Sequence, residues 1–176
     1  MKVNVCRFNL FLALLGVAVV CGCKTSGHHQ PVSTVRVHIE SPALGAGTQS
    51  ISVLRSDPVL VTISQEPILT EANVVEAKLF QAPGGFAIDI QFDEEGAWIL
   101  EQYSAANPGK HLVIFGQWEG PDGKPTKGRW LSAPLITQRI SDGILSFTPD
   151  MSQDEAGKWV LGLNNVAKKD QKGQTK

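Results

Sequence analysis

The sequence has few cysteines and no excess of charge of either sign. All three cysteines of the 176 residues lie within the first 23 positions, which excludes a disulfide-stabilised domain in the rest of the chain. The formal net charge is -1, so the basic excess that generic nucleic-acid binding requires is absent. Hydrophobic residues make up 42% and aromatic residues 7%, which is globular composition, and the length allows one core.

The first 23 residues have the layout of a secretory signal. Basic residues precede an apolar run from Leu10 to Val20, which is too short to span a bilayer. Cys23, after a glycine, resembles the acylated cysteine of bacterial lipoproteins, whereas Cys21 fits less well because a bulky valine precedes it. We therefore expect a signal peptide at 1–22, lipidation of Cys23 and a periplasm-facing envelope protein; an uncleaved anchor or an ordinary secretory signal is the alternative. In the lipoprotein families that it resembles, an aspartate directly after the cysteine favours retention in the inner membrane. Lys24 stands there instead, so sorting to the outer membrane is expected.

Polar segments flank the expected domain at both ends. Residues 23–34 predict a flexible tether, and the pair His28-His29 within it lacks the fixed geometry of a metal site, so no metal or cofactor is expected. Residues 168–176 hold four lysines and one aspartate, a net charge of +3. Such a basic tail is usually a solvated, frayed end; contact with a membrane surface or a partner is the alternative.

Residues 35–66 predict a set of N-terminal strands. Apolar and polar residues alternate from Val35 to Glu40, which predicts a half-buried strand with His38 on its polar face. Two more short strands are expected at 51–55 and 59–63. This part of the chain either extends the main sheet or packs as a separate hairpin.

Capping residues mark two helices. Asp93 precedes two glutamates and predicts a helix over 94–106, and Ser152 with Glu155 forms a capping box for a helix over 153–166. Apolar alternation and turn residues predict the strands 75–80 and 86–92, joined as a hairpin, and 112–115, 130–137 and 144–147.

Three stretches carry a resemblance to a known family. They are FDEEGAWILEQYSAANPGKHLVIF at 92–115, LSAPLI at 131–136 and SDGILSFTPDMSQDEAGKWVLGL at 141–163. In order and spacing they resemble the large periplasmic head of SecD, the protein-export subunit that works with SecF beside the Sec translocon. Over residues 67–167 the resemblance implies an α+β fold, with an antiparallel sheet and two helices packed on one face. Ser104 stands where that family prefers threonine.

The resemblance also implies a role in protein export. SecD heads are thought to pull on emerging chains in response to proton flow through attached membrane segments, and no such segments follow in this sequence. We therefore expect a non-enzymatic lipoprotein that binds polypeptide or a translocon component. The alternative is a structural or assembly lipoprotein that docks on one envelope partner.

Candidate partner-binding residues flank a long loop at 116–128. Trp118, Arg129 and Trp130 are residue types that dominate interface hot spots, although both tryptophans could instead close the small core. The following strand is interrupted by Pro134, which suits a sheet edge to which an extended chain could add.

No catalytic motif accompanies these residues. The acidic run 93–95 is explained by helix capping, and His111 has no serine or cysteine nucleophile nearby in the pattern. Asn164 and Asn165 are expected to cap the end of the last helix. We therefore expect neither enzymatic activity nor a small-molecule substrate.

Overall fold

A computed structural model of the chain describes residues 30–120 and 122–174. The signal peptide at 1–22 and Cys23 lie outside the described residues. In chain order the elements are β1 (Ser33–Ile39), β2 (Thr48–Val53), β3 (Val59–Ser64), β4 (Leu69–Thr70), the 3-10 turn η1 (Glu71–Asn73), β5 (Val74–Ala82), β6 (Gly85–Phe92), α2 (Glu94–Ala106), β7 (Leu112–Trp118), β8 (Arg129–Ser132), β9 (Ile144–Phe147) and α3 (Gln153–Gln174). β1 thus begins within the segment 23–34 that the sequence assigned to the tether.

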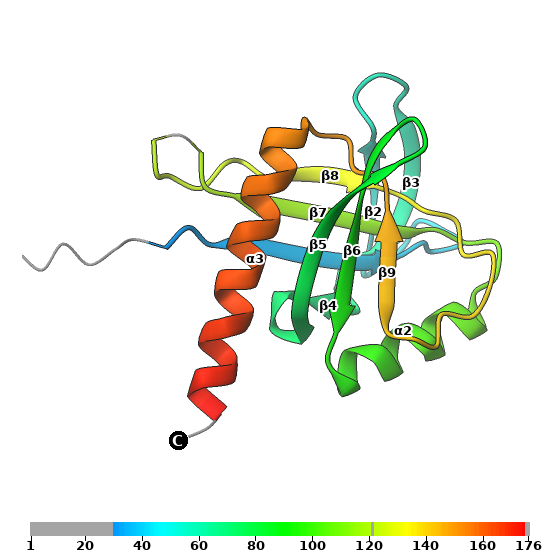
Figure 1. The fold of residues 1–176 in the computed structure, drawn as a ribbon. Coiled ribbons are helices and arrows are strands. Elements are labelled where there is room, and N and C mark those ends of the chain that lie inside the picture. The colour runs from blue at the N-terminus through cyan, green and yellow to red at the C-terminus, as the bar shows by residue number, and fades with distance from the viewer. Residues whose placement is uncertain (1–29, 121, 175–176) are drawn as a thin grey trace, which may run out of the picture.

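The strands of the described residues form three antiparallel sheets, in the orders β4-β1-β7-β8, β2-β3 and β5-β6-β9. Figure 1 shows the three-stranded sheet lying across the four-stranded one, with α3 beside β5 and α2 below β6 and β9. The α+β class and the antiparallel pairing are confirmed. The expected single sheet is wrong, because the hairpin β5-β6 takes β9 as its partner and stays separate from β1 and β7.

The N-terminal strands both extend a sheet and form a hairpin. β1 lies inside the four-stranded sheet between β4 and β7. β2 and β3 pair with each other and cover the outer face of that sheet, and Ile63 of β3 also bridges Glu40 just after β1. The expectation that His38 faces solvent is therefore wrong, because the hairpin buries it to 4% exposure. Its Nδ1–H donates to the carbonyl of Ser64 at 2.8 Å, and its ring lies edge-on to Trp130.

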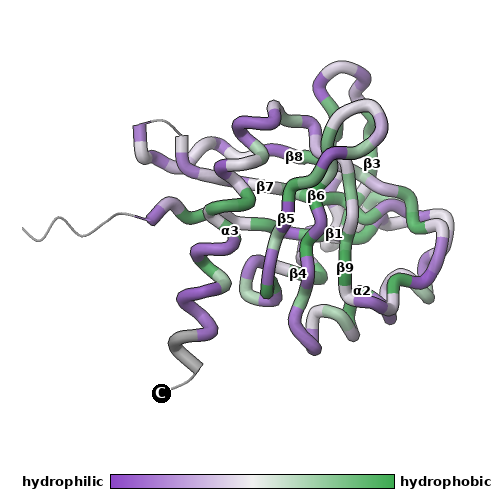
Figure 2. The backbone as a smooth tube through the Cα atoms, in the orientation of Figure 1, coloured by the Kyte–Doolittle hydropathy of each residue, from purple (hydrophilic) through white to green (hydrophobic). Residues whose placement is uncertain are grey.

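The main core lies between the two larger sheets and is closed by α3. Trp159 of α3 is fully buried, and its indole N–H donates to the carbonyl of Thr34 at 3.0 Å. Gly162 lets the helix pass close to β1, because a Cβ there would lie 2.8 Å from both Cβ and N of Ser33. Figure 2 shows apolar residues along β9 and hydrophilic ones on the later coloured turns of α3.

Both helices begin at the predicted caps. The Asp93 carboxylate accepts the N–H of Gly96 at 2.7 Å, and Ser152 and Glu155 exchange the two hydrogen bonds of a capping box. The second helix is longer than expected: it runs to Gln174, so the tail 168–174 is helical rather than frayed. In the part of the chain that the structure covers, no helix has the length and apolar character needed to cross a membrane.

Candidate functional site

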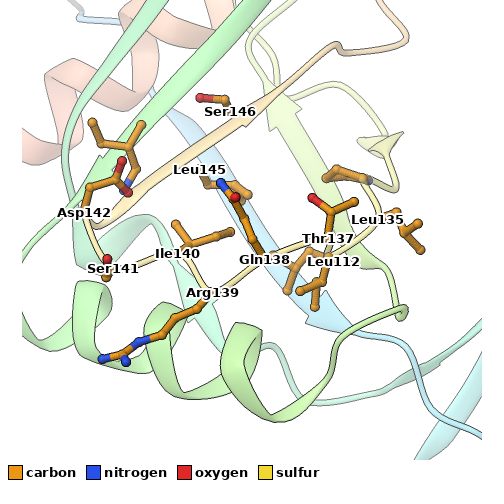
Figure 3. A pocket seen from close by; sticks show the side chains of 13 residues that line it. Leu112, Leu135, Thr137, Gln138, Arg139, Ile140, Ser141, Asp142, Leu145 and Ser146 are labelled. Carbon is orange, nitrogen blue, oxygen red and sulfur yellow. The ribbon is translucent and has the colours of Figure 1, made fainter.

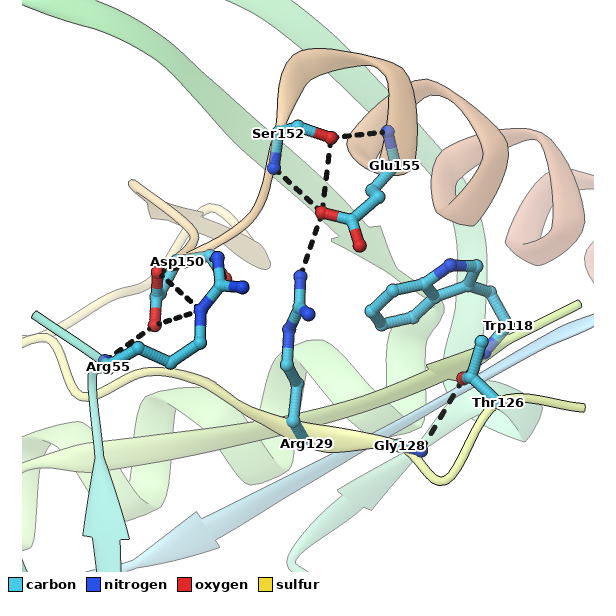
Figure 4. Close-up of polar contacts among 8 residues, drawn as sticks. All are labelled: Arg55, Trp118, Thr126, Gly128, Arg129, Asp150, Ser152 and Glu155. Atoms are coloured by element: carbon cyan, nitrogen blue, oxygen red, sulfur yellow. Dashed lines mark hydrogen bonds and ion pairs between the residues drawn. The ribbon is translucent and has the colours of Figure 1, made fainter. Parts of the chain in front are cut away.

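The three residues expected to form an exposed interface are packed into the fold, and Figure 4 shows two of them, Trp118 and Arg129. Trp118 belongs to β7, is only 5% exposed and contributes to the main core. Trp130 is half-buried against His38 and Phe115, with ring centroids 5.3 and 5.2 Å away. Both tryptophans therefore pack within the domain, Trp118 in the main core and Trp130 beside the hairpin β2-β3.

Arg129 is committed to contacts within the domain. Its guanidinium lies 4.9 Å from the ring of Trp118, and its Nη2 donates to Oε2 of Glu155 at 2.9 Å. Burial acts to raise the pKa of Glu155, but hydrogen bonds from Ser152 and from Arg129 hold it below its ordinary value. The charge of Arg129 is therefore used to fasten β8 to the start of α3.

The loop before β8 is shorter than expected and is tied to β7. Residues 116–118 are strand, so the connection spans 119–128. Thr126 binds β7 through its backbone and side chain: its N–H donates to the Trp118 carbonyl at 2.7 Å, and its Oγ1 accepts the N–H of Trp118 at 3.3 Å. The amide of Gln117 adds a bond to the Thr126 carbonyl.

The edge expected at the Pro134-bearing strand is covered. β8 is an outer strand of its sheet, but it ends at Ser132, and the carbonyl of Leu131 accepts the N–H of Asp150 at 2.7 Å. The Asp150 carboxylate in turn binds the backbone N–H and the guanidinium of Arg55, whose hydrogen bonds hold the pKa of Asp150 low. An added strand cannot pair with β8 at this point.

An open strand edge lies instead at β9. β9 pairs with β6 on one side, and Phe92 N–H donates to the Gly143 carbonyl at 3.0 Å. Since hydrogen-bonding direction alternates along an antiparallel strand, Leu145 and Phe147 also face β6, whereas Ile144 and Ser146 direct their backbone groups away from it. Asp142 accepts the N–H of Ile144, and among the described residues no strand lies on that side of β9.

A groove of about 390 Å³ runs along this open edge (Figure 3). Its lining combines apolar side chains, of which Leu112, Ile136 and Leu145 are almost fully buried, with polar ones that supply more of the exposed surface. The apolar residues are Leu112, Pro134, Leu135, Ile136, Ile140, Ile144 and Leu145, and the polar ones are Thr137, Gln138, Arg139, Ser141, Asp142 and Ser146.

The wall opposite β9 is the segment 134–142, which is fastened to its surroundings. The N–H of Ile136 donates to the Lys110 carbonyl at 2.8 Å, and the N–H of Ile140 donates to Oγ of Ser104 at 2.9 Å. Arg139 forms an ion pair with Glu101 of α2. The groove is therefore held open by hydrogen bonds on both sides, and Ser104 supplies the hydroxyl that threonine would supply in the family that the sequence resembles.

His111 lies at one end of the groove wall, where it pairs with Leu135. Oε2 of Glu40 accepts both its backbone N–H at 2.9 Å and its ring Nδ1–H at 2.7 Å. Burial acts to raise the pKa of Glu40, but these hydrogen bonds and the nearby Lys110 lower it overall. In residues 30–120 and 122–174, no three histidine, cysteine or acidic side chains are grouped to hold a metal ion.

Asn164 and Asn165 lie within α3 and do not cap its end. Asn164 Oδ1 accepts the N–H of Ala77 at 2.8 Å, and its Nδ2 donates to the carbonyl of the same residue at 2.9 Å. This amide satisfies the outer edge of β5 as a neighbouring strand would. Nδ2 of Asn165 donates to the carbonyl of Pro31. The expectation of terminal caps is therefore wrong, because the helix continues for two and more turns beyond them.

Sequence reasoning missed the groove at β9. The alternation in Ile144–Phe147 predicted the strand correctly. The residue pattern of a four-residue strand does not predict which of its edges will lack a neighbouring strand. The Ser-Ala-Pro segment and the turn at Asp142-Gly143 were the available signals, since both interrupt regular pairing next to a strand.

Comparisons with known proteins agree on one family. The family model described as SecDF, P1 head subdomain matches residues 48–167. A solved structure described as a membrane component SecDF that enhances protein export aligns with a TM-score of 0.51 at 18% identity, covering 93% of this chain and 70% of that one. The crystal structure of SecDF in a super-membrane-facing form aligns with a TM-score of 0.51 at 21% identity, covering 75% of this chain and 18% of that one. Among curated proteins, no match is found.

Proposed function

Because this chain belongs to the family of SecDF P1 head subdomains, we propose that it is a non-enzymatic envelope lipoprotein whose head binds extended polypeptide during protein export. The observation that carries this proposal is the open edge of β9 beside a groove with an apolar floor. A strand edge of this kind accepts an extended segment through main-chain hydrogen bonds.

The binding mode follows from the direction of the backbone groups. The N–H and C=O of Ser146 and the C=O of Ile144 face away from β6 and can pair with an added strand. Alternate side chains of that strand would then point towards the apolar floor formed by residues such as Leu145 and Ile136. The bound segment would become the fourth strand of the sheet.

This mode suits partners of varied sequence. Main-chain hydrogen bonds do not depend on the side chains of the partner, and the shallow apolar floor imposes only a preference for alternating apolar residues. The charges of the wall are already engaged, since Arg139 pairs with Glu101 and Asp142 accepts the N–H of Ile144. We therefore propose weak and broad recognition of unfolded chains.

The lipid anchor completes the proposal. Lipidation of Cys23 would hold the head at the periplasmic face of a membrane through the short segment before β1. We propose the outer membrane, because Lys24 stands where an aspartate would favour retention in the inner membrane. Mass spectrometry of the purified protein tests this part separately. An intact Met1 or an unmodified Cys23 thiol would contradict it.

A second candidate is a structural lipoprotein that docks permanently on one envelope protein. Trp98 favours it, because this residue of α2 is 62% exposed and exposed tryptophans are frequent at the centre of protein interfaces. The two candidates differ in the variety of their partners and in the face that contacts them.

In-cell crosslinking distinguishes the two candidates. A photo-reactive residue at Leu135, on the groove wall and 50% exposed, should capture many secreted chains, whereas one at Leu60 of the hairpin, 78% exposed, should not. One dominant product from position 98 and none from position 135 would favour docking on a single partner.

A matched pair of variants tests the β9 edge itself. Ser146→Pro removes an outward N–H without removing a backbone hydrogen bond to β6. Ser146→Ala keeps that N–H and, like the proline variant, lacks the hydroxyl that donates to Asp89, so it is the matched control. We expect Ser146→Pro to abolish crosslinking from position 135 and Ser146→Ala to preserve it. Unchanged crosslinking in Ser146→Pro, with unfolding transitions like those of the parent, would refute strand addition at β9.

A further inference from the structure

The last turns of α3 form a basic end, which we define as residues 168–174. This end holds Lys168, Lys169 and Lys172 against Asp170. Lys168 and Lys169 are exposed and lie beyond Ala167, which is buried. Figure 1 shows this end projecting past the strands. It therefore adds nothing to the core.

The basic end lies beside the start of the described chain. Asn165 Nδ2 donates to the carbonyl of Pro31 at 2.9 Å, and Gly162 passes directly over Ser33. Lys168 and Lys169 follow Asn165 at the i+3 and i+4 positions, so they lie on the same side of the helix as the residue that binds Pro31. The helix face that contacts the N-terminal segment therefore carries Lys168 and Lys169 in its next turn.

This position brings the lysines near a membrane if Cys23 carries lipid. Seven residues separate Cys23 from Pro31, and a fully extended chain over these eight residue steps spans at most about 28 Å. The side of the domain from which the tether leaves is therefore the side that faces the bilayer. The basic end of α3 is on that side.

The surrounding charges leave the basic end positive. Glu76 lies near Lys168 but already pairs with Lys78 at 2.9 Å, and Glu119 accepts the N–H of Val32. Asp170 is the acidic residue on the basic end itself. The cluster is thus complementary to a negatively charged surface.

We infer that the basic end of α3 binds the surface of an anionic phospholipid bilayer and so orients the head on its membrane. A lipid anchor combined with a basic patch is an established two-signal arrangement for membrane proteins. The inference rests on the proposed function only for the lipid anchor at Cys23. Binding of the basic end to the bilayer would turn the C-terminal end of α3 towards the lipid headgroups.

Lysine footprinting on vesicles tests the inference. The lipidated protein is reconstituted into neutral phosphatidylcholine vesicles and into vesicles that contain phosphatidylglycerol, and is then acetylated with a water-soluble reagent. Lys168 and Lys169 should react about fivefold more slowly on the anionic vesicles, because each lysine near such a surface is stabilised by roughly that factor. Lys158, exposed near the start of the same helix, is the matched control and should react equally on both.

The outcomes separate this inference from the proposed function. Equal acetylation of Lys168 and Lys169 on the two kinds of vesicle would overturn the inference, even if the protein floats with both. Flotation with anionic vesicles alone would instead support the basic end and contradict the lipid anchor. A variant with Lys168, Lys169 and Lys172 changed to glutamine should float with both kinds of vesicle. Flotation of that variant only with anionic vesicles would overturn the assignment to these lysines.

Discussion

Two glycines of α3 should respond to alanine with opposite signs. A Cβ at Gly157 meets no atom within 4 Å, whereas a Cβ at Gly162 lies 2.8 Å from Cβ and N of Ser33 and closer still to its hydroxyl. Both positions are inside the same helix, so the helix propensity gained from alanine is the same at both. The difference between the variants therefore isolates the close approach of α3 to β1.

The magnitudes follow from these contacts. Gly157→Ala should raise the free energy of unfolding by about 0.5–1 kcal/mol, since alanine favours helix over glycine by roughly that amount. At Gly162 the same gain is outweighed, because two of the three nearest atoms belong to the backbone or Cβ of Ser33 and cannot rotate away. The helix must move outward, which weakens the hydrogen bond from Trp159 to Thr34 and the packing around it. With overpacking costs of about 3 kcal/mol, Gly162→Ala should be destabilising by about 2 kcal/mol.

Urea and thermal unfolding of the two variants provide the measurement. We expect the midpoint temperature to rise by roughly 3 °C in Gly157→Ala and to fall by roughly 7 °C in Gly162→Ala. Circular dichroism before unfolding checks that both variants retain their helices. If Gly162→Ala were as stable as Gly157→Ala, then α3 would not cross β1 at Ser33, and the route of the tether beside α3 would have to be abandoned.

Two further variants probe the hairpin and the groove wall. Burial holds the pKa of His38 below its ordinary value, so the folded state should lose stability as the pH falls below about 6.5; His38→Gln should flatten this loss between pH 7.5 and 5.5 in urea titrations. An unchanged slope would show that another group titrates. Ser104→Ala should cost about 1–2 kcal/mol and speed hydrogen exchange at the Ile140 amide, whereas Ser104→Thr keeps the hydroxyl and should behave like the parent. Equal exchange rates in both variants would show that this hydroxyl does not hold the wall.

Local signals in the sequence predicted the elements well. The caps at Asp93 and Ser152 located the starts of both helices, and the turn between 82 and 85 located the hairpin β5-β6. These features depend on residues within one turn or one strand, where backbone hydrogen-bonding needs are satisfied by near neighbours. The family resemblance added the expectation that these helices and strands form an antiparallel α+β fold.

Features that depend on distant partners were not predictable. His38 lies at a polar position of an alternating strand, yet the hairpin β2-β3 covers it, because both faces of the four-stranded sheet are used. Tryptophan suits an interface and a core equally, and the structure places Trp118 in the main core. Asn164 carried no signal of its contact with Ala77, since that contact joins residues far apart in the chain. The open edge of β9 belongs to the same class of feature.

The central place of β1 constrains when the domain can form. Ser33 pairs with Trp118 and Ile39 with Leu112, so the first strand of the domain must wait for β7 before its longest ladder can close. Folds with such non-local pairing form slowly. Bringing the two strands together costs the conformational entropy of the long intervening chain before the native contacts can offset that cost. A chain that emerges N-terminus first, from a ribosome or through a membrane pore, would therefore stay extensible until most of the domain has passed. Late closure of this ladder would keep the chain of the head unfolded, and able to pass through a pore, until its passage is nearly complete.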